Sequence, residues 1–147
     1  DAQESRGLGD VYKRQGHWDE SYINDGKDEF HHYTFLNCTI ANVSSAVIRK
    51  GDYSKEFALA KQYKQAGDWM FYANLMQKGK VAYFARGYNY YRVHTNNVST
   101  VTKKQDHIEE IKRIHAYYDQ EFHLDAKQKK EIQKRYQFLA KVWRVKV

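Results

Sequence analysis

The sequence predicts a mixed α/β domain built from short strands with flanking helices and a C-terminal helical pair. At 147 residues the chain is long enough for one domain and too short for two comfortable ones. Short runs rich in β-forming residues predict strands at 43–48, 80–85 and 88–94. Longer runs with apolar residues at helical spacing predict helices, and the last two of these follow one another at the C-terminal end.

Turn residues and caps set the predicted helix limits in the first half of the chain. A helix is expected over 27–38, after the turn NDG. Ser54 is the predicted N-cap of a helix that reaches about residue 63. The next helix begins at Asp68 and ends at Gly79, which has the position of a C-terminal glycine cap. Its apolar positions with helical spacing are Phe71, Leu75 and Met76.

Capping boxes open both helices of the C-terminal pair. They are formed by Thr102 with Gln105 and by Asp125 with Gln128. The apolar stripes are Ile108, Ile111, Ile114, Tyr118 and Phe122 in the first helix and Ile132, Tyr136, Leu139 and Trp143 in the second. Between residues 127 and 146 there are eight Lys or Arg residues and one acid, Glu131. Such a helix either lies on an anionic membrane surface or packs on the domain with a solvated charged face.

Composition limits the classes of function. The net charge of +7 favours anionic partners such as phosphates, lipid headgroups or nucleic acid. No recognition motif accompanies the basic helix, so nucleic acid is not an expected partner. Cys38 is the only cysteine, which excludes an intrachain disulfide and a cysteine-based zinc site, and the histidines lack zinc-ligand spacing. No run approaches the ~20 apolar residues that a membrane-spanning helix needs.

The first residues are expected to lie outside the folded domain. The run SRGLGDVYKRQ at 5–15 resembles one translated reading frame of the transposase adapter used to prepare sequencing libraries. We therefore interpret residues 1–15 as a disordered, adapter-derived segment, and the alternative is a genuine mobile N-terminus. Under the first interpretation an upstream part of the protein is missing.

Asp68 is the main candidate for chemistry. A carboxylate at a helix N-terminus accepts backbone N–H bonds and interacts favourably with the helix dipole, and both effects favour the ionised form. Asp68 is therefore expected to be an ionised helix cap. An ionised carboxylate with a fixed position beside Trp69 also suits a general base. Periodicity does not separate the two interpretations.

Four short motifs occur in order between residues 39 and 99: NVSS at 42–45, GDW at 67–69, KGK at 78–80 and YYRVH at 90–94. This order resembles the C-terminal half of bacterial family 2 glycosyltransferases. The resemblance implies a partial GT-A fold, which is nucleotide-diphospho-sugar transferase-like, with the acceptor-side half at 16–101 and a helical extension at 102–147. It implies a fragment of an inverting glycosyltransferase of cell envelope polysaccharide biosynthesis. Such an enzyme transfers a sugar from a nucleotide-sugar donor to a hydroxyl of a surface glycan or lipid-linked acceptor.

The resemblance also implies residue roles. Asp68 matches the catalytic base, which takes the proton of the acceptor hydroxyl. The other matching residues are predicted to bind substrates: Asn42, Ser44 and Ser45 beneath the donor sugar, Arg92 at the diphosphate, Trp69 at the acceptor, and His94 at the metal or diphosphate. From the residues alone, the two serines equally fit a buried strand, Trp69 equally fits core packing, and His94 fits a structural role.

The sequence lacks the D-x-D motif with which this family holds a divalent cation, Mg or Mn, against the nucleotide diphosphate. The cation is therefore expected in the full-length enzyme, with ligands N-terminal to Gly16, and the fragment alone is expected to be inactive. The resemblance implies a cytoplasmic protein, peripheral at the inner face of the plasma membrane. The alternative is a non-enzymatic basic α/β module that binds an anionic membrane or a protein partner through its C-terminal amphipathic helix.

Overall fold

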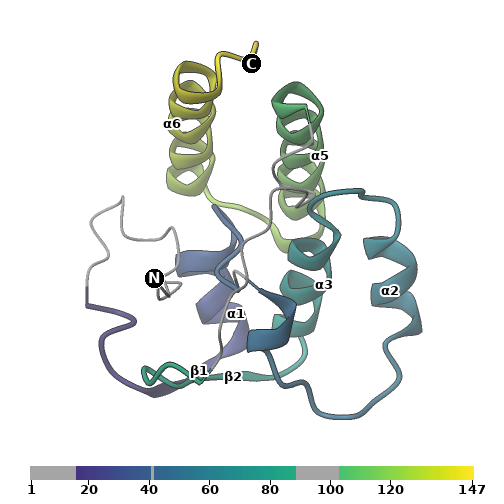
Figure 1. Ribbon diagram of the computed structural model, residues 1–147, viewed down its shortest axis with the longest axis vertical. Coiled ribbons are helices and arrows are strands. Elements are labelled where there is room, and N and C mark those ends of the chain that lie inside the picture. The colour runs from purple at the N-terminus through teal and green to yellow at the C-terminus, as the bar shows by residue number, and fades with distance from the viewer. Residues whose placement is uncertain (1–15, 41, 89–102) are drawn as a thin grey trace.

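The computed structural model describes residues 16–40, 42–88 and 103–147. The elements in chain order are β1 (Tyr22–Asp25), α1 (Gly26–Glu29), the π-helix η2 (Phe30–Thr34), the 3-10 helix η3 (Val43–Ser45), α2 (Ser54–Ala60), α3 (Gly67–Met76), β2 (Lys80–Tyr83), α5 (Lys104–Phe122) and α6 (Ala126–Trp143). The fold is thus mixed α/β and mostly helical, with a C-terminal helical pair. Figure 1 shows α3 between α1 and α2, with α5 and α6 side by side at the other end of the molecule.

The sheet in the described part of the chain pairs β1 with β2 in antiparallel order. Its register places Tyr22 opposite Tyr83, and their rings stack with centroids 5.3 Å apart. The predicted strand at 80–85 is confirmed in its first part, and β1 was not predicted. Asp25 ends β1 and caps α1 with its carboxylate, which accepts the N–H of Lys27 at 2.9 Å. The predicted helix at 27–38 therefore exists, although it begins at Gly26 and ends with η2.

The predicted strand at 43–48 is wrong. This segment begins with η3, where the side chain of Asn42 accepts the N–H of Ser44 at 3.2 Å. Its apolar side chains face solvent, since Val43 is 63% and Val47 102% exposed. A short apolar run does not by itself reveal whether a partner strand covers it. The predicted strand at 88–94 lies, apart from Tyr88, outside the described residues.

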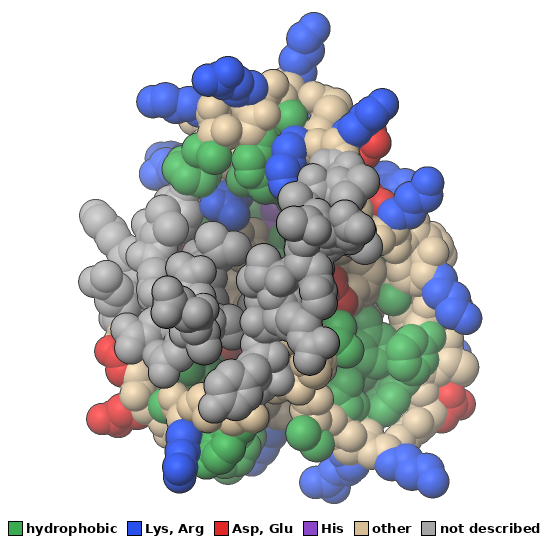
Figure 2. Space-filling model, viewed as in Figure 1, with side chains coloured by type: hydrophobic (Ala, Val, Ile, Leu, Met, Phe, Trp, Pro, Cys, Tyr) green, Lys and Arg blue, Asp and Glu red, His purple; other side chains and the backbone are tan. Residues whose placement is uncertain are grey.

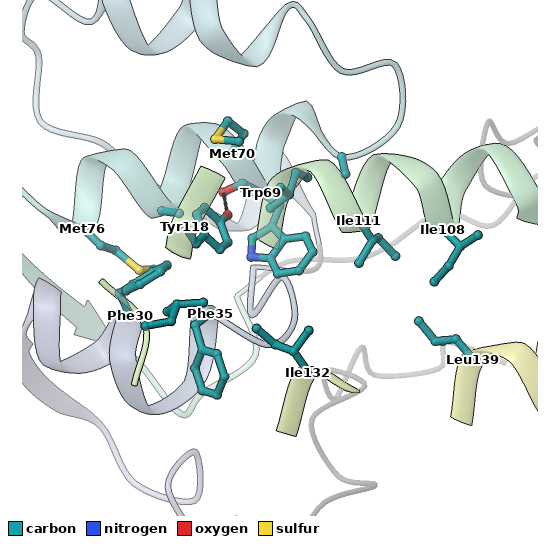
Figure 3. Packing of buried hydrophobic residues seen from close by; sticks show 14 residues of the cluster. Phe30, Phe35, Trp69, Met70, Met76, Ile108, Ile111, Tyr118, Ile132 and Leu139 are labelled. Atoms are coloured by element: carbon teal, nitrogen blue, oxygen red, sulfur yellow. Dashed lines mark hydrogen bonds between the residues drawn. The ribbon is translucent and has the colours of Figure 1, made fainter. Parts of the chain in front are cut away.

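One hydrophobic cluster joins η2, α3, α5 and α6 (Figure 3). The apolar stripe of α5 is confirmed, because Ile108, Ile114 and Tyr118 are fully buried. The burial of Ile132 and Leu139 likewise confirms part of the predicted stripe of α6. Trp69, Met70 and Met76 of α3, together with Phe30 and Phe35, complete the centre of this core. The Tyr118 hydroxyl donates to the carbonyl of Trp69 at 3.3 Å. The expected division at residues 101–102 thus separates two segments that share one core.

The N-caps of α2 and α5 differ from the predicted residues, whereas the N-cap of α6 agrees with the prediction. Tyr53 rather than Ser54 is the N-cap of α2, and Lys103 rather than Thr102 is the N-cap of α5. The capping box at α6 is confirmed: Asp125 Oδ1 accepts the Gln128 N–H at 2.7 Å, and the Gln128 side chain accepts the Asp125 N–H at 2.9 Å.

Gly79 is not the left-handed C-cap that the sequence predicts. Helix α3 ends at Met76, its C-cap Gln77 has right-handed helical angles, and Gly79 has no positive φ. Instead, the Gly79 carbonyl accepts the N–H of Gly26 at 2.8 Å. This bond joins the start of α1 to the turn that follows α3. Gly26, rather than Gly79, is therefore the glycine that the close packing of these two segments requires.

The C-terminal helix α6 keeps the amphipathic and basic character that the sequence predicts. Lys and Arg side chains project from the end of the molecule that α5 and α6 form (Figure 2). Phe138 and Val142, one turn apart, are 37% and 55% exposed. Within the described ranges, no helix combines the length and apolar character needed to cross a membrane. Membrane contact through α6 stays a prediction.

Candidate active site around Asp68

Asp68 lies in the first turn of α3, where it is half-buried. Its Oδ1 accepts the N–H of the next residue, Trp69, at 2.8 Å. Burial raises the pKa of the Asp68 carboxyl above its ordinary value, against the opposing effects of this N–H and of His107. The N-cap of α3 is Ala66, so the expectation that Asp68 is the helix cap is wrong, and burial opposes the ionised form that the cap was expected to favour. Loss of water around the carboxylate outweighs the backbone N–H bonds.

The turn that leads into α3 is held by a residue of a different helix. Glu110 of α5 accepts the backbone N–H groups of Lys64, Gln65 and Ala66 at 2.8, 2.9 and 3.2 Å. We call these three bonds the Glu110 clamp. Burial raises the pKa of Glu110, but the three N–H groups together bring it below its ordinary value. The Glu110 clamp thus fixes the turn before α3. Among the described residues, Asp68 Oδ1 accepts the Trp69 N–H and Oδ2 accepts no hydrogen bond.

Four further titratable groups interact with Asp68: the fully buried Tyr118, and Cys38, Tyr72 and His107, which with Asp68 form what we call the Asp68 cluster. Burial and then Asp68 raise the pKa of Cys38 to about 12, and they also raise that of Tyr72 to about 12. Burial and Lys104 lower the pKa of His107. At neutral pH the Cys38 thiol and the Tyr72 hydroxyl are protonated and His107 is uncharged, so Asp68 carries the charge of the cluster.

The segment 42–45 follows Cys38 of this cluster closely in sequence. Asn42 follows Cys38 by four residues, which limits its distance to about 14 Å. Ser44 and Ser45 are exposed, and the Ser45 hydroxyl donates to the Asn42 carbonyl at 2.6 Å. The hydroxyls are therefore on the surface rather than in a buried strand. Whether they face a donor sugar stays a prediction.

Trp69 belongs to the core. It is 4% exposed, and its indole N–H donates to the carbonyl of Thr34 at 2.7 Å. Its ring meets those of His115 and Tyr118 edge-on. A ring enclosed in this way does not stack on an acceptor sugar, so core packing replaces the predicted acceptor contact. The two other predicted site residues, Arg92 and His94, lie outside the described residues.

A second polar network surrounds Glu29, a residue for which the sequence analysis predicts no role. The carboxylate is 2% exposed and accepts bonds from the Tyr22 hydroxyl at 2.8 Å and the Asn24 amide at 3.1 Å. His17 Nε2 lies 3.1 Å from Glu29 Oε1, and the His17 ring stacks on Tyr33. Burial and the bond to Glu29 raise the pKa of Tyr22 far above its ordinary value. These groups satisfy one another, so the network anchors residues 17–24 to α1.

The described residues do not fit the divalent cation that the family resemblance implies. Among them, no group of three or more His, Cys, Asp or Glu side chains is arranged to hold a metal ion. Asp25, at the end of β1, is engaged in capping α1.

Comparison with known proteins identifies no relative of this chain. No family model matches it, and neither does any curated protein or solved structure. The glycosyltransferase interpretation therefore depends on the four sequence motifs and on the properties of Asp68.

Proposed function

We propose that this chain is the acceptor-side half of an inverting family 2 glycosyltransferase in which Asp68 is the general base. The observation that supports this most directly is the state of Asp68. Its carboxylate is half-buried, its pKa is raised, and Oδ2 is not used by the described residues. A carboxylate with these properties is a stronger base than an ordinary surface aspartate.

The proposed step is a single displacement at the anomeric carbon of a nucleotide sugar. The oxygen of an acceptor hydroxyl forms a bond to this carbon, and the bond from the carbon to the diphosphate oxygen breaks. The nucleoside diphosphate leaves with the bonding electrons, and the hydroxyl proton passes to Asp68. Inversion follows because the acceptor attacks from the face opposite the leaving group.

The surroundings of Asp68 favour this role. The raised pKa values of Cys38 and Tyr72, each about 12, keep both groups uncharged at neutral pH. No second anion of the cluster then competes for the proton. The bond from the Trp69 N–H fixes one carboxylate oxygen and so orients the other.

The remaining parts of the proposed site are supplied from elsewhere. Ser44 and Ser45 are exposed and would contact the nucleotide sugar, with the Ser45 hydroxyl, which donates to the Asn42 carbonyl, acting as an acceptor. The diphosphate and its cation require ligands outside the described residues. The proposed acceptor is a surface glycan or a lipid-linked molecule.

In the protein that includes the donor-binding half, we expect Asp68→Asn to lower kcat by about a hundred- to ten-thousand-fold, because the amide cannot take the proton. The amide oxygen can still accept the Trp69 N–H, so folding and nucleotide affinity should change little. Release of nucleoside diphosphate in the presence of acceptor measures kcat, and calorimetry measures nucleotide binding.

The matched control is Asp106→Asn, which neutralises an exposed aspartate in the first turn of α5. This variant should keep the wild-type rate. Wild-type turnover by Asp68→Asn would show that Asp68 is a structural residue and not the base.

A further inference from the structure

We propose that His107 of α5 is a positioning residue for Asp68 of α3, kept beside it by the Glu110 clamp. The catalytic meaning of this pair rests on the proposed function, whereas the pairing itself is a property of the fold. Its role is to present an uncharged imidazole to the carboxylate.

The clamp determines where His107 lies. Glu110 holds the backbone of residues 64–66, which lead directly into α3. His107 precedes Glu110 by three residues on the same helix, so both side chains lie on one face, about 4.5 Å apart along the axis. That face of α5 is therefore the one opposite the first turn of α3, where Asp68 lies.

The core on either side of His107 supports this placement. Its neighbour Ile108 is fully buried, and Ile111 follows one turn later. In Figure 3, Trp69 lies alongside α5 between Tyr118 and Ile111. Since Trp69 directly follows Asp68, the start of α3 packs against the middle of α5, where Trp69 meets His115 and Tyr118.

The imidazole ring is itself held in place from α6. It lies against Trp143, with ring centroids 5.2 Å apart and planes at 34°. Lys104 Nζ lies 5.2 Å from the Trp143 ring centroid, on the same side of α5. His107 is thus half-buried, with one face against Trp143.

Electrostatic interactions join the two groups in both directions. The charge of Asp68 raises the pKa of His107, and protonated His107 lowers the pKa of Asp68. Lys104 and Glu110 also act on His107, in opposite directions, while Cys38 and Tyr72 interact with Asp68. Burial has the largest effect on His107 and favours its uncharged form. The base therefore keeps its raised pKa at neutral pH, whereas a charged imidazole would make it a weaker base.

The test is an NMR titration of the histidine rings in the full chain, without substrate. In Asp68→Asn the pKa of His107 should fall, because the anion that raises it is gone. Asp106→Asn removes a charge next to His107 in sequence and should give a smaller change. The exposed His32 serves as an internal reference that should not move. An unchanged His107 pKa in Asp68→Asn would overturn the pairing, whatever the enzyme assay shows.

The catalytic meaning has a separate readout. His107→Phe keeps an aromatic ring against Trp143 but removes the charge. In the protein with its donor-binding half, the acidic limb of the kcat/KM profile should shift to higher pH in this variant, because protonated His107 no longer lowers the pKa of Asp68. An unchanged profile in an active enzyme would refute the positioning role and leave the proposed function standing.

Discussion

Replacing Gly26 with alanine should destabilise the protein by ~3 kcal/mol or more, a large fraction of the stability of a domain of this size. A Cβ at this position would overlap the Met76 carbonyl oxygen and lie 2.5 Å from the Gly79 carbonyl oxygen. Both obstacles are backbone atoms at the end of α3, so no side-chain rotation relieves the overlap. The hydrogen bond from the Gly26 N–H to the Gly79 carbonyl, 2.8 Å long, would be lost as these two segments of the chain move apart.

Gly79→Ala is the matched control for this prediction. A Cβ there meets no atom within 4 Å, and the residue has no positive φ. Its free energy of unfolding should stay within about 0.5 kcal/mol of wild type. Urea unfolding of both variants provides the measurement. Equal stability of Gly26→Ala and Gly79→Ala would contradict the packing of α1 on the end of α3.

Lowering the pH from about 6.5 to about 4 should remove about 3 kcal/mol of stability through His115 alone. Burial lowers the pKa of this histidine from 6.5 to about 4. Its Nδ1 lies 2.8 Å from the Tyr136 hydroxyl, and its ring meets that of Trp69 edge-on. Between these two pH values the unfolded chain binds a proton that the folded chain does not. The folded state is therefore favoured above this window and loses that advantage as the pH falls through it.

His115→Phe isolates this contribution because it keeps the ring and removes the titration. Its free energy of unfolding should depend less on pH than that of wild type between 6.5 and about 4.5. This range lies above the one in which carboxylates with lowered pKa values, such as Glu110, lose their contribution. Urea midpoints measured at several pH values give both curves. Parallel curves would show that His115 is not buried in its uncharged form.

Local sequence patterns predicted the C-terminal part of the fold well. The stripe of α5 and the capping box of α6 involve residues three or four apart, so the helix itself determines their geometry. The buried face of helix α3 was harder to predict from the sequence. Its predicted apolar positions Phe71 and Met76 are buried, but so are four further residues: Trp69, Met70, Tyr72 and Ala73. A helix surrounded by α1, α2 and α5 has no single apolar face to detect.

The physical state of the candidate site could not be predicted from the sequence. The motif around Asp68 singles out this carboxylate, but its pKa depends on burial by residues far away in sequence. The Glu110 clamp joins positions more than 40 residues apart, and no spacing rule connects them. The same limit explains why Trp69 and segment 43–48 were misjudged, since their exposure depends on which elements cover them.

The most direct test of the central claim is a structure of the protein with its donor-binding half, a non-reactive nucleotide sugar and an acceptor. We predict that Oδ2 of Asp68 lies about 2.6–3.2 Å from the acceptor hydroxyl that faces the anomeric carbon. The bond from the Trp69 N–H to the other oxygen should persist. An acceptor hydroxyl that instead meets a different base, with Asp68 bonded to the backbone alone, would contradict the account.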